Sequence, residues 1–181
     1  MENTQSIGKR EGFILASGGV ERSHAYYLKE ACKYATLHSD DQDTKNGAIL
    51  VCGDKVVYAA NMMPSAMVKA TDERTSRPLK YQFIEHAERT ALLRAAASGI
   101  KTQGATLYCP WYACVDCARA IIVAGIKEVV GVKKVMDATP ERWSETIGTA
   151  NLMLSEAGVI MTYAEDTLGT TMVFGGSTID L

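Results

Sequence analysis

Residues 105–132 of this 181-residue chain read ATLYCPWYACVDCARAIIVAGIKEVVGV. Two short apolar runs, at 105–109 and 127–132, enclose an alanine- and isoleucine-rich segment that ends at Gly125. The runs have the length and composition of buried strands, and the segment between them is typical of a helix closed by glycine. Because a helical crossover joins two strands in parallel, this stretch predicts a strand–helix–strand unit within a parallel sheet.

The flanking sequence extends this alternation. Capping residues, hydrophobic periodicity and glycine stops predict helices over about 24–37, 86–98 and 141–157, and strands over 47–52, 55–60 and 159–163. The two strands separated only by Gly53-Asp54 are expected to form a hairpin. The expected fold is α/β and three-layered: one mixed sheet of about five strands, the last of them parallel, with helices on both faces. Residues 170–179 could add a short edge strand.

The two ends of the chain differ in character. Residues 1–20 are glycine-containing and show little periodicity, so we expect an irregular tail there and a single domain over 21–181. A long connection, 62–83, holds two prolines and a charged cluster. Connections of this length inside a compact domain are often functional, and a solvated insertion is the alternative.

Composition narrows the classes of function. The formal net charge is -2, without the basic excess typical of proteins that bind a nucleic-acid polymer, so a small-molecule substrate is favoured. No apolar run approaches the roughly 18 residues of a membrane span, and the run at 13–16 is too short for a signal peptide. The five cysteines are odd in number, which favours metal or redox chemistry in a reducing compartment. We expect a cytoplasmic protein without a membrane partner.

Two short motifs carry metal-ligating side chains: His86-Ala-Glu88 and Cys114-Val-Asp-Cys117. Each is expected to begin a helix, where the helix dipole favours thiolate over thiol, and cysteines at i and i+3 share a face. Two thiolates and one imidazole leave the fourth tetrahedral position for water, as in catalytic zinc sites. His86, Cys114 and Cys117 are therefore the predicted zinc ligands, and Glu88 the predicted acid–base group beside the water.

His-x-Glu followed by Cys-x-x-Cys is the signature of zinc-dependent nucleobase deaminases. From about residue 27 to residue 159 the chain resembles the deoxycytidylate (dCMP) deaminase family in particular. The matching strings are Ser39 and Asp41 before Gly47-Ala-Ile-Leu-Val51; Ala60-Asn-Met-Met-Pro64; Lys80-Tyr81 ahead of His86-Ala-Glu88; Leu107-Tyr through Cys114-Val-Asp-Cys117-Ala-Arg-Ala-Ile-Ile; Ala124-Gly-Ile-Lys-Glu-Val-Val130; and Ala157-Gly-Val159.

The resemblance implies hydrolytic deamination of dCMP to dUMP and ammonia, which would supply dUMP for thymidylate synthesis. Water activated by zinc would attack C4 of the cytosine ring, and Glu88 would protonate N3 and then the departing amine. The family usually assembles as homo-oligomers, hexamers among them, and several members are regulated by dCTP and dTTP. A homo-oligomer, with a hexamer favoured, and these two candidate regulators are therefore expected here.

Substrate contacts are expected from four residues. The resemblance identifies Asn61 as the family's substrate-binding asparagine, and Ala87 lies between two site residues. Trp111 and Tyr112 precede the metal cysteines and are expected to line the base pocket, with plain packing as the alternative. Four cations of the long connection are candidates for a phosphate contact or for a solvated loop face: Lys69, Arg74, Arg77 and Lys80.

The chain departs from the family's pattern at three places. Ala113 stands where proline commonly precedes the first metal cysteine, and His38 where an arginine often precedes the serine of the first loop. Ala59 and Met62 replace the glycines on either side of the substrate asparagine. Those glycines belong to the regulatory nucleotide region of regulated members, so their replacement bears on activation by dCTP.

Three other functions share part of this pattern. A tRNA adenosine deaminase has the same metal motif, but a basic C-terminal segment is expected of it, and residues 165–181 contain no Lys or Arg. A deaminase of another small ring (dCTP, a 5-substituted dCMP, a free base or a riboflavin precursor) would use the same chemistry. A structural zinc protein would leave Glu88 without a purpose.

Overall fold

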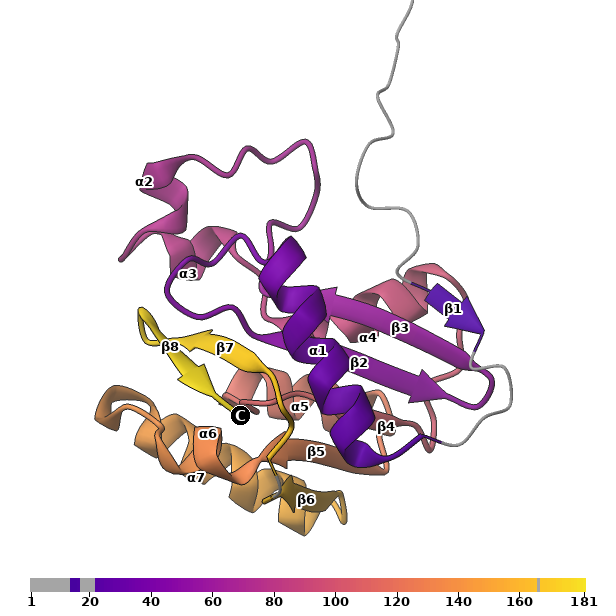
Figure 1. The fold of residues 1–181 in the computed structure, drawn as a ribbon. Helices are drawn as coiled ribbons and strands as arrows, with labels where there is room; N and C mark the ends of the chain where they lie inside the picture. The colour runs from indigo at the N-terminus through magenta and orange to yellow at the C-terminus, as the bar shows by residue number, and fades with distance from the viewer. Residues whose placement is uncertain (1–13, 17–21, 166) are drawn as a thin grey trace, which may run out of the picture.

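The computed structural model describes residues 14–16, 22–165 and 167–181. A mixed six-stranded sheet runs through its centre in the order β1-β3-β2-β4-β5-β6 (Figure 1). Its strands are β1 (Ile14–Ala16), β2 (Gly47–Cys52), β3 (Lys55–Ala60), β4 (Thr106–Tyr108), β5 (Glu128–Val132) and β6 (Ile160–Ala164). β2 pairs antiparallel with β3 and β4, whereas β4, β5 and β6 are mutually parallel. The predicted hairpin and the predicted parallel half are both confirmed.

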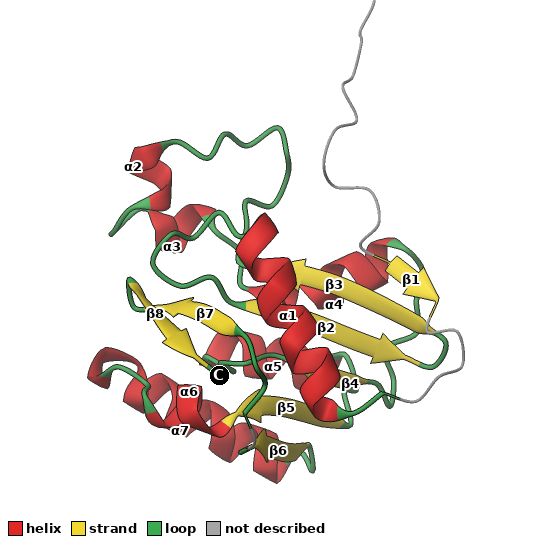
Figure 2. Cartoon of the chain, viewed as in Figure 1, coloured by secondary structure: helices red, strands yellow, loops and turns green. Residues whose placement is uncertain are grey.

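Helices cover the sheet on both faces (Figure 2). α1 (His24–His38) packs on one face, and α4 (Ala87–Ala97) packs on the other, together with α5 (Val115–Val123) and α7 (Glu141–Glu156). Each face of the sheet has its own hydrophobic core, and successive residues of β2 contribute to different cores. Leu50 is buried with α4 and α5, and Ile49 is buried with α1. The three-layered α/β class predicted from the sequence is therefore confirmed.

The first helix is placed by local sequence and by one close approach. Ser23 caps α1, its side chain accepting a hydrogen bond from the Tyr26 N–H at 3.2 Å, as the sequence predicts. Gly47, which begins β2, is needed because a Cβ there would lie 2.1 Å from the Ala31 carbonyl oxygen. The helix consequently lies close against the strand that leads out of the loop over residues 39–46.

The C-terminal segment differs from its prediction. β7 (Thr171–Phe174) and β8 (Ser177–Asp180) form a separate two-stranded hairpin instead of an edge strand of the main sheet. Met172 and Phe174 bury their side chains in the α1 core, and the Lys45 N–H donates to the Val173 carbonyl at 2.9 Å. The hairpin therefore packs across the loop 39–46, where both its apolar face and its backbone find partners.

Several short elements were not predicted. The long connection contains α2 (Asp72–Thr75) and α3 (Lys80–Phe83), and α6 (Lys133–Asp137) follows β5. Within the tail predicted as irregular, Ile14–Ala16 forms β1 and pairs with β3. The other residues of that tail lie outside those described.

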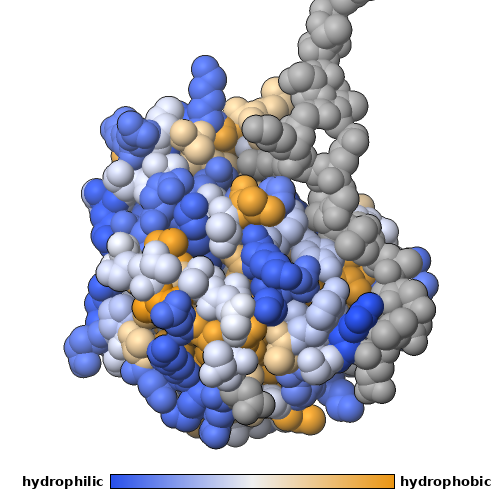
Figure 3. All heavy atoms as spheres, in the orientation of Figure 1, coloured by the Kyte–Doolittle hydropathy of each residue, from blue (hydrophilic) through white to orange (hydrophobic). Residues whose placement is uncertain are grey.

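The surface shown in Figure 3 mixes polar residues with small apolar patches. Among the described residues, none of the helices combines the length and the apolar character that crossing a membrane requires.

Candidate active site

Two helix N-termini bring three metal-ligating side chains together. His86 is the N-cap of α4, Cys114 is the N-cap of α5, and Cys117 lies in the first turn of α5. The His86 Nδ1 atom lies 3.5 Å from each Sγ, and the two Sγ atoms are 3.6 Å apart. A tetrahedral zinc ion, with Zn–S bonds of about 2.3 Å and Zn–N bonds of about 2.0 Å, separates its ligand atoms by roughly 3.5–3.8 Å. The donor set and its spacing fit zinc, and these residues could hold the ion.

The two thiols are unequal. The pKa of the Cys114 thiol is lowered to about 3, mainly by the hydrogen bond between the two thiols and also by the hydrogen bond with His86, against the opposing effect of burial. The same shared proton, together with burial, raises the pKa of Cys117. The pair therefore favours one thiolate at neutral pH, which is the form that binds a metal.

Glu88 lies in the first turn of α4 and is 2% exposed. Burial raises the pKa of its carboxyl group, and the nearby His86 opposes this rise. Its Oε2 atom has no hydrogen-bond partner among the described residues. A buried carboxylate with an unused oxygen is costly unless a ligand or a bound water satisfies it. This residue therefore has the burial and the free acceptor expected of a proton carrier.

A second layer of polar side chains supports the ligands, and sequence reasoning missed it. The Arg89 Nη1 atom lies 3.3 Å from the Cys117 Sγ and 3.8 Å from the Cys114 Sγ. Arg89 also donates from Nε to Glu85 Oε1 at 2.7 Å, and this oxygen accepts the His86 N–H at 2.9 Å. The available signal was the i, i+4 spacing of Glu85 and Arg89 around the His-x-Glu motif.

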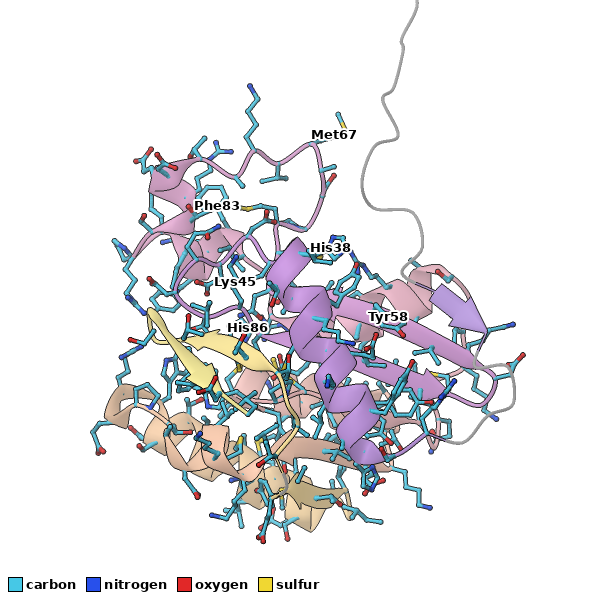
Figure 4. All side chains as sticks on the ribbon, viewed as in Figure 1. His38, Lys45, Tyr58, Met67, Phe83 and His86 are labelled. Atoms are coloured by element: carbon cyan, nitrogen blue, oxygen red, sulfur yellow. The ribbon has the colours of Figure 1, made fainter. Side chains whose placement is uncertain are left out.

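His86 and Cys114 line one part of a cavity, called its floor below. His86 lies near the centre of the molecule in Figure 4, whereas Met67 projects from the outer edge of the long connection. Asn61 lines this cavity, and its Oδ1 atom accepts the Ala87 N–H at 3.0 Å while its Nδ2 atom donates to the Thr44 carbonyl at 3.1 Å. Ala87, the fourth expected substrate contact, is fully buried and is not among the residues that line the cavity, which is also true of Glu88 and Cys117. The role of Ala87 in the structure is to hold the Asn61 amide in place.

The two aromatic residues before the metal cysteines both line the cavity, as expected. Trp111 donates from its indole N–H to Thr139 Oγ1 at 3.0 Å. Tyr112 is 1% exposed and packs over Gly131, where a Cβ would lie 2.6 Å from its ring. The Asn46 side chain, which sequence reasoning missed, donates to the Trp111 carbonyl at 2.8 Å and so fixes the turn that carries both rings.

Part of the cavity lining, called the α7 wall below, comes from α7, which was predicted as a helix but not as part of the site. Arg142, Trp143 and Ile147 all line the cavity. The Trp143 ring meets those of Tyr81, His86 and Trp111 edge-on, with centroids 6.1, 6.2 and 5.7 Å away. Helical periodicity marks the buried face of α7, but only the packed structure shows that one end of this face reaches the metal ligands.

The four candidate phosphate-binding cations separate into two groups. Lys80 is buried and donates to both carboxylate oxygens of Asp41, at 2.8 and 3.0 Å, and to Asp43 at 3.0 Å. Arg77 pairs with Asp43 at 2.8 Å, and both cations line the cavity. The other two candidates, Lys69 and Arg74, do not line it.

Arg142 adds a cation that the sequence did not single out. It is exposed at the cavity mouth and makes no hydrogen bond or ion pair with the described residues. Arg142, Arg77 and Lys80 together carry three positive charges, against the two negative charges of Asp41 and Asp43. The mouth of the cavity is therefore cationic and suits a small anionic group.

Comparison with known proteins gives concordant results. The family described as cytidine and deoxycytidylate deaminase zinc-binding region matches residues 21–133. Human deoxycytidylate deaminase is 35% identical over 144 residues, 74% of this chain and 75% of that protein. An uncharacterised deaminase of Aliivibrio fischeri is 30% identical over 126 residues, 69% of this chain and 82% of that protein.

Among solved structures, the dCMP deaminase of cyanophage S-TIM5 in complex with dCMP and dUMP is similar, with a TM-score of 0.60 and 26% identity over 77% of this chain and 94% of that one. The family match ends at residue 133, so it contains the three ligands and Glu88 but not α7 or the β7–β8 hairpin.

Proposed function

Because the chain belongs to the cytidine and deoxycytidylate deaminase zinc-binding family, we propose that it is a zinc-dependent hydrolase that converts dCMP to dUMP and ammonia. The observation that carries this proposal is the position of Glu88. It is a fully buried carboxylate with an unused oxygen, and it lies beside three side chains spaced as zinc ligands. A structural zinc site would not need such a group.

His86, Cys114 and Cys117 would hold the zinc. When bound, it supplies the positive charge that makes a water molecule acidic enough to act as a nucleophile near neutral pH. Hydrolysis forms a bond from the water oxygen to C4 and breaks the bond from C4 to the amino nitrogen. The water loses two protons, and Glu88 would carry one to ring N3 and the other to the leaving amine, so that ammonia departs.

The chain's other residues would bind and orient the nucleotide. The amide of Asn61, held by Ala87 and Thr44, would present a fixed polar edge to the sugar or base. Arg77 and Arg142 would meet the 5′-phosphate at the cationic mouth. The related cyanophage enzyme, whose structure holds dCMP and dUMP, supports a monophosphate as the substrate.

We also propose, from the family resemblance, a cytoplasmic homo-oligomer with a hexamer favoured, dCTP and dTTP as candidate regulators, and a role in supplying dUMP for thymidylate synthesis. The alanine and methionine on either side of Asn61 make activation by dCTP the point to measure first. Loss of cytosine absorbance should be followed with dCMP, dCTP, deoxycytidine and 5-methyl-dCMP, with and without dCTP and dTTP. We expect dCMP to give the highest kcat/KM.

The substitution Glu88→Gln tests the mechanism. It keeps the size of the side chain but removes the proton carrier, so kcat should fall by about 10²–10⁴-fold. Zinc content should stay stoichiometric, because Glu88 is not a ligand. Glu156→Gln, at an exposed position near the end of α7, is the matched control and should behave as wild type. Deamination by the Glu88 variant at the wild-type rate would refute the mechanism.

A further inference from the structure

We propose that Trp143 is a substrate-contacting residue that limits the size of the group at C5 of the pyrimidine ring. The inference rests on the proposed function, because it assumes that a cytosine ring reacts beside His86 and Cys114. It concerns a part of the cavity that lies outside the matched family region, since Trp143 is in α7 and the match ends at residue 133.

Trp143 lies within contact range of the floor of the cavity. Its ring centroid is 6.2 Å from that of His86 with an interplanar angle of 61°, which is the range of direct edge-to-face contact between rings. A pyrimidine ring whose C4 approaches the space between the ligands must therefore lie within van der Waals reach of the Trp143 indole.

Neighbouring residues hold Trp143 in a defined place. Trp111 meets it at 5.7 Å and 90°, and Trp111 is itself fixed by the hydrogen bond to Thr139 and by edge contact with Phe174 of β7 at 5.0 Å. On the other side, Tyr81 meets Trp143 at 6.1 Å, and its hydroxyl accepts from Arg77 Nε at 3.1 Å. A wall anchored on two sides can discriminate by size, because it does not easily yield to a larger ligand.

The distribution of polar groups sets which edge of the ring faces this wall. Asn61 is bonded to Thr44 and to Ala87, the neighbour of Glu88 in the first turn of α4, so these polar groups gather at the start of α4. The α7 residues Trp143 and Ile147 give the lining an aromatic and an apolar side chain, beside the cation of Arg142. Cytosine has one polar edge, with N3, O2 and the amino group, and one apolar edge, with C5 and C6. Since N3 must reach Glu88, the apolar edge turns toward Trp143, and a substituent on C5 meets the indole first.

The chain contains two tryptophans, Trp111 and Trp143, and both line the cavity. Fluorescence of the single-tryptophan variants therefore reports on this site alone. In the Trp111→Phe protein, the remaining Trp143 should show a saturable change in emission as dUMP is added. This readout measures contact and does not depend on turnover.

The kinetics of Trp143→Phe and Trp143→Ala test whether Trp143 selects substrates by the size of the group at C5. We expect the Ala variant to raise KM for dCMP by about tenfold, from loss of an aromatic contact and of buried area, with a smaller effect on kcat. It should also raise the ratio of kcat/KM for 5-methyl-dCMP to that for dCMP by about tenfold, the effect of making room for one methyl group. The Phe variant, which keeps an aromatic ring, should lie between the Ala variant and wild type.

Leu152→Ala, an exposed apolar position on the same helix outside the cavity, is the matched control, with zinc content and circular dichroism confirming that each variant folds. If wild type deaminates dCMP and both Trp143 variants keep its KM and its substrate ratio, the role of Trp143 is refuted while the proposed function stands. An emission of Trp143 that dUMP leaves unchanged in an active protein refutes it equally. Wild-type protein that does not deaminate dCMP overturns the proposed function and this inference with it.

Discussion

The floor of the cavity and its α7 wall differ in how far apart in the chain their supporting contacts lie. The floor is built from two local motifs, each at the start of a helix, so that three ligand atoms come within 3.6 Å of one another once α4 and α5 are packed side by side. The wall depends on Trp143, whose partners come from α3, from the turn before α5 and, through Trp111, from β7. The floor lies within the matched family region, whereas Trp143 lies beyond its end.

The largest effect should come from breaking the floor. Cys117→Ala removes a ligand that is fully buried and cannot be replaced by solvent, so both zinc and detectable deamination should be lost. Metal analysis of the purified variant, beside the activity assay, checks this. Cys52→Ala, a buried cysteine outside the ligand cluster, should keep stoichiometric zinc. Full zinc occupancy in the Cys117 variant would remove this residue from the site.

A smaller effect is expected one layer behind the ligands. Arg89 lies close to both ligand sulfurs and is held by Glu85, so Arg89→Gln should weaken zinc binding by about 10–100-fold without abolishing it. Competition with a chelator of known affinity measures the change. Arg119→Gln, an exposed arginine on α5, serves as control. Equal affinities for the two variants would show that Arg89 does not support the site.

This difference between floor and wall explains what the sequence could predict. The bounds of β2 and β3, the crossover through α5 and the three ligands all follow from local patterns: strand composition, a glycine stop and the i, i+3 spacing of cysteines at a helix start. The sequence places Trp143 only within the predicted helix over 141–157, because its neighbours Tyr81 and Trp111 lie more than thirty residues away in the chain. Contacts between residues so far apart leave no periodicity in one sequence.

The same limit applies to the charged residues of the long connection. Composition could not separate Lys80, which is buried against Asp41, from Lys69, which does not line the cavity. It also could not find Arg142, whose position at the cavity mouth depends on the packing of α7.

Substitution of Arg142 tests whether the α7 wall binds the phosphate, without changing the zinc ligands or Glu88. Arg142→Ala should raise KM for dCMP by about tenfold, the effect of one charge-assisted hydrogen bond, with kcat nearly unchanged. Deoxycytidine, which lacks the phosphate, should react equally well with variant and wild type. Lys69→Ala, an exposed cation that does not line the cavity, is the control. An equal rise in KM for nucleotide and nucleoside would mean that Arg142 acts through packing and not through the phosphate.

The smallest effect is expected on stability, from Asp43, which supports the α7 wall of the cavity. Its carboxylate accepts from Lys80, and its backbone carbonyl accepts from Gly176 in the hairpin, so this residue joins α3 to the turn between β7 and β8. The hydrogen bond from Lys80 lowers the pKa of the Asp43 carboxyl, against partial burial. A lowered folded-state pKa contributes stability above the unfolded value of about 3.9 and loses it as pH falls through the folded value.

Asp43→Asn should therefore destabilise the protein at pH 7 by less than about 1 kcal/mol, because the carboxylate is partly solvated. The difference from wild type should shrink as pH is lowered from 5 to 3. Urea unfolding at several pH values measures it, with Asp54→Asn, in the exposed turn between β2 and β3, as the matched control. A difference that stays constant over this range would refute the role of the Asp43 charge, because the substitution keeps the backbone hydrogen bond to Gly176 and removes only the ionisable group.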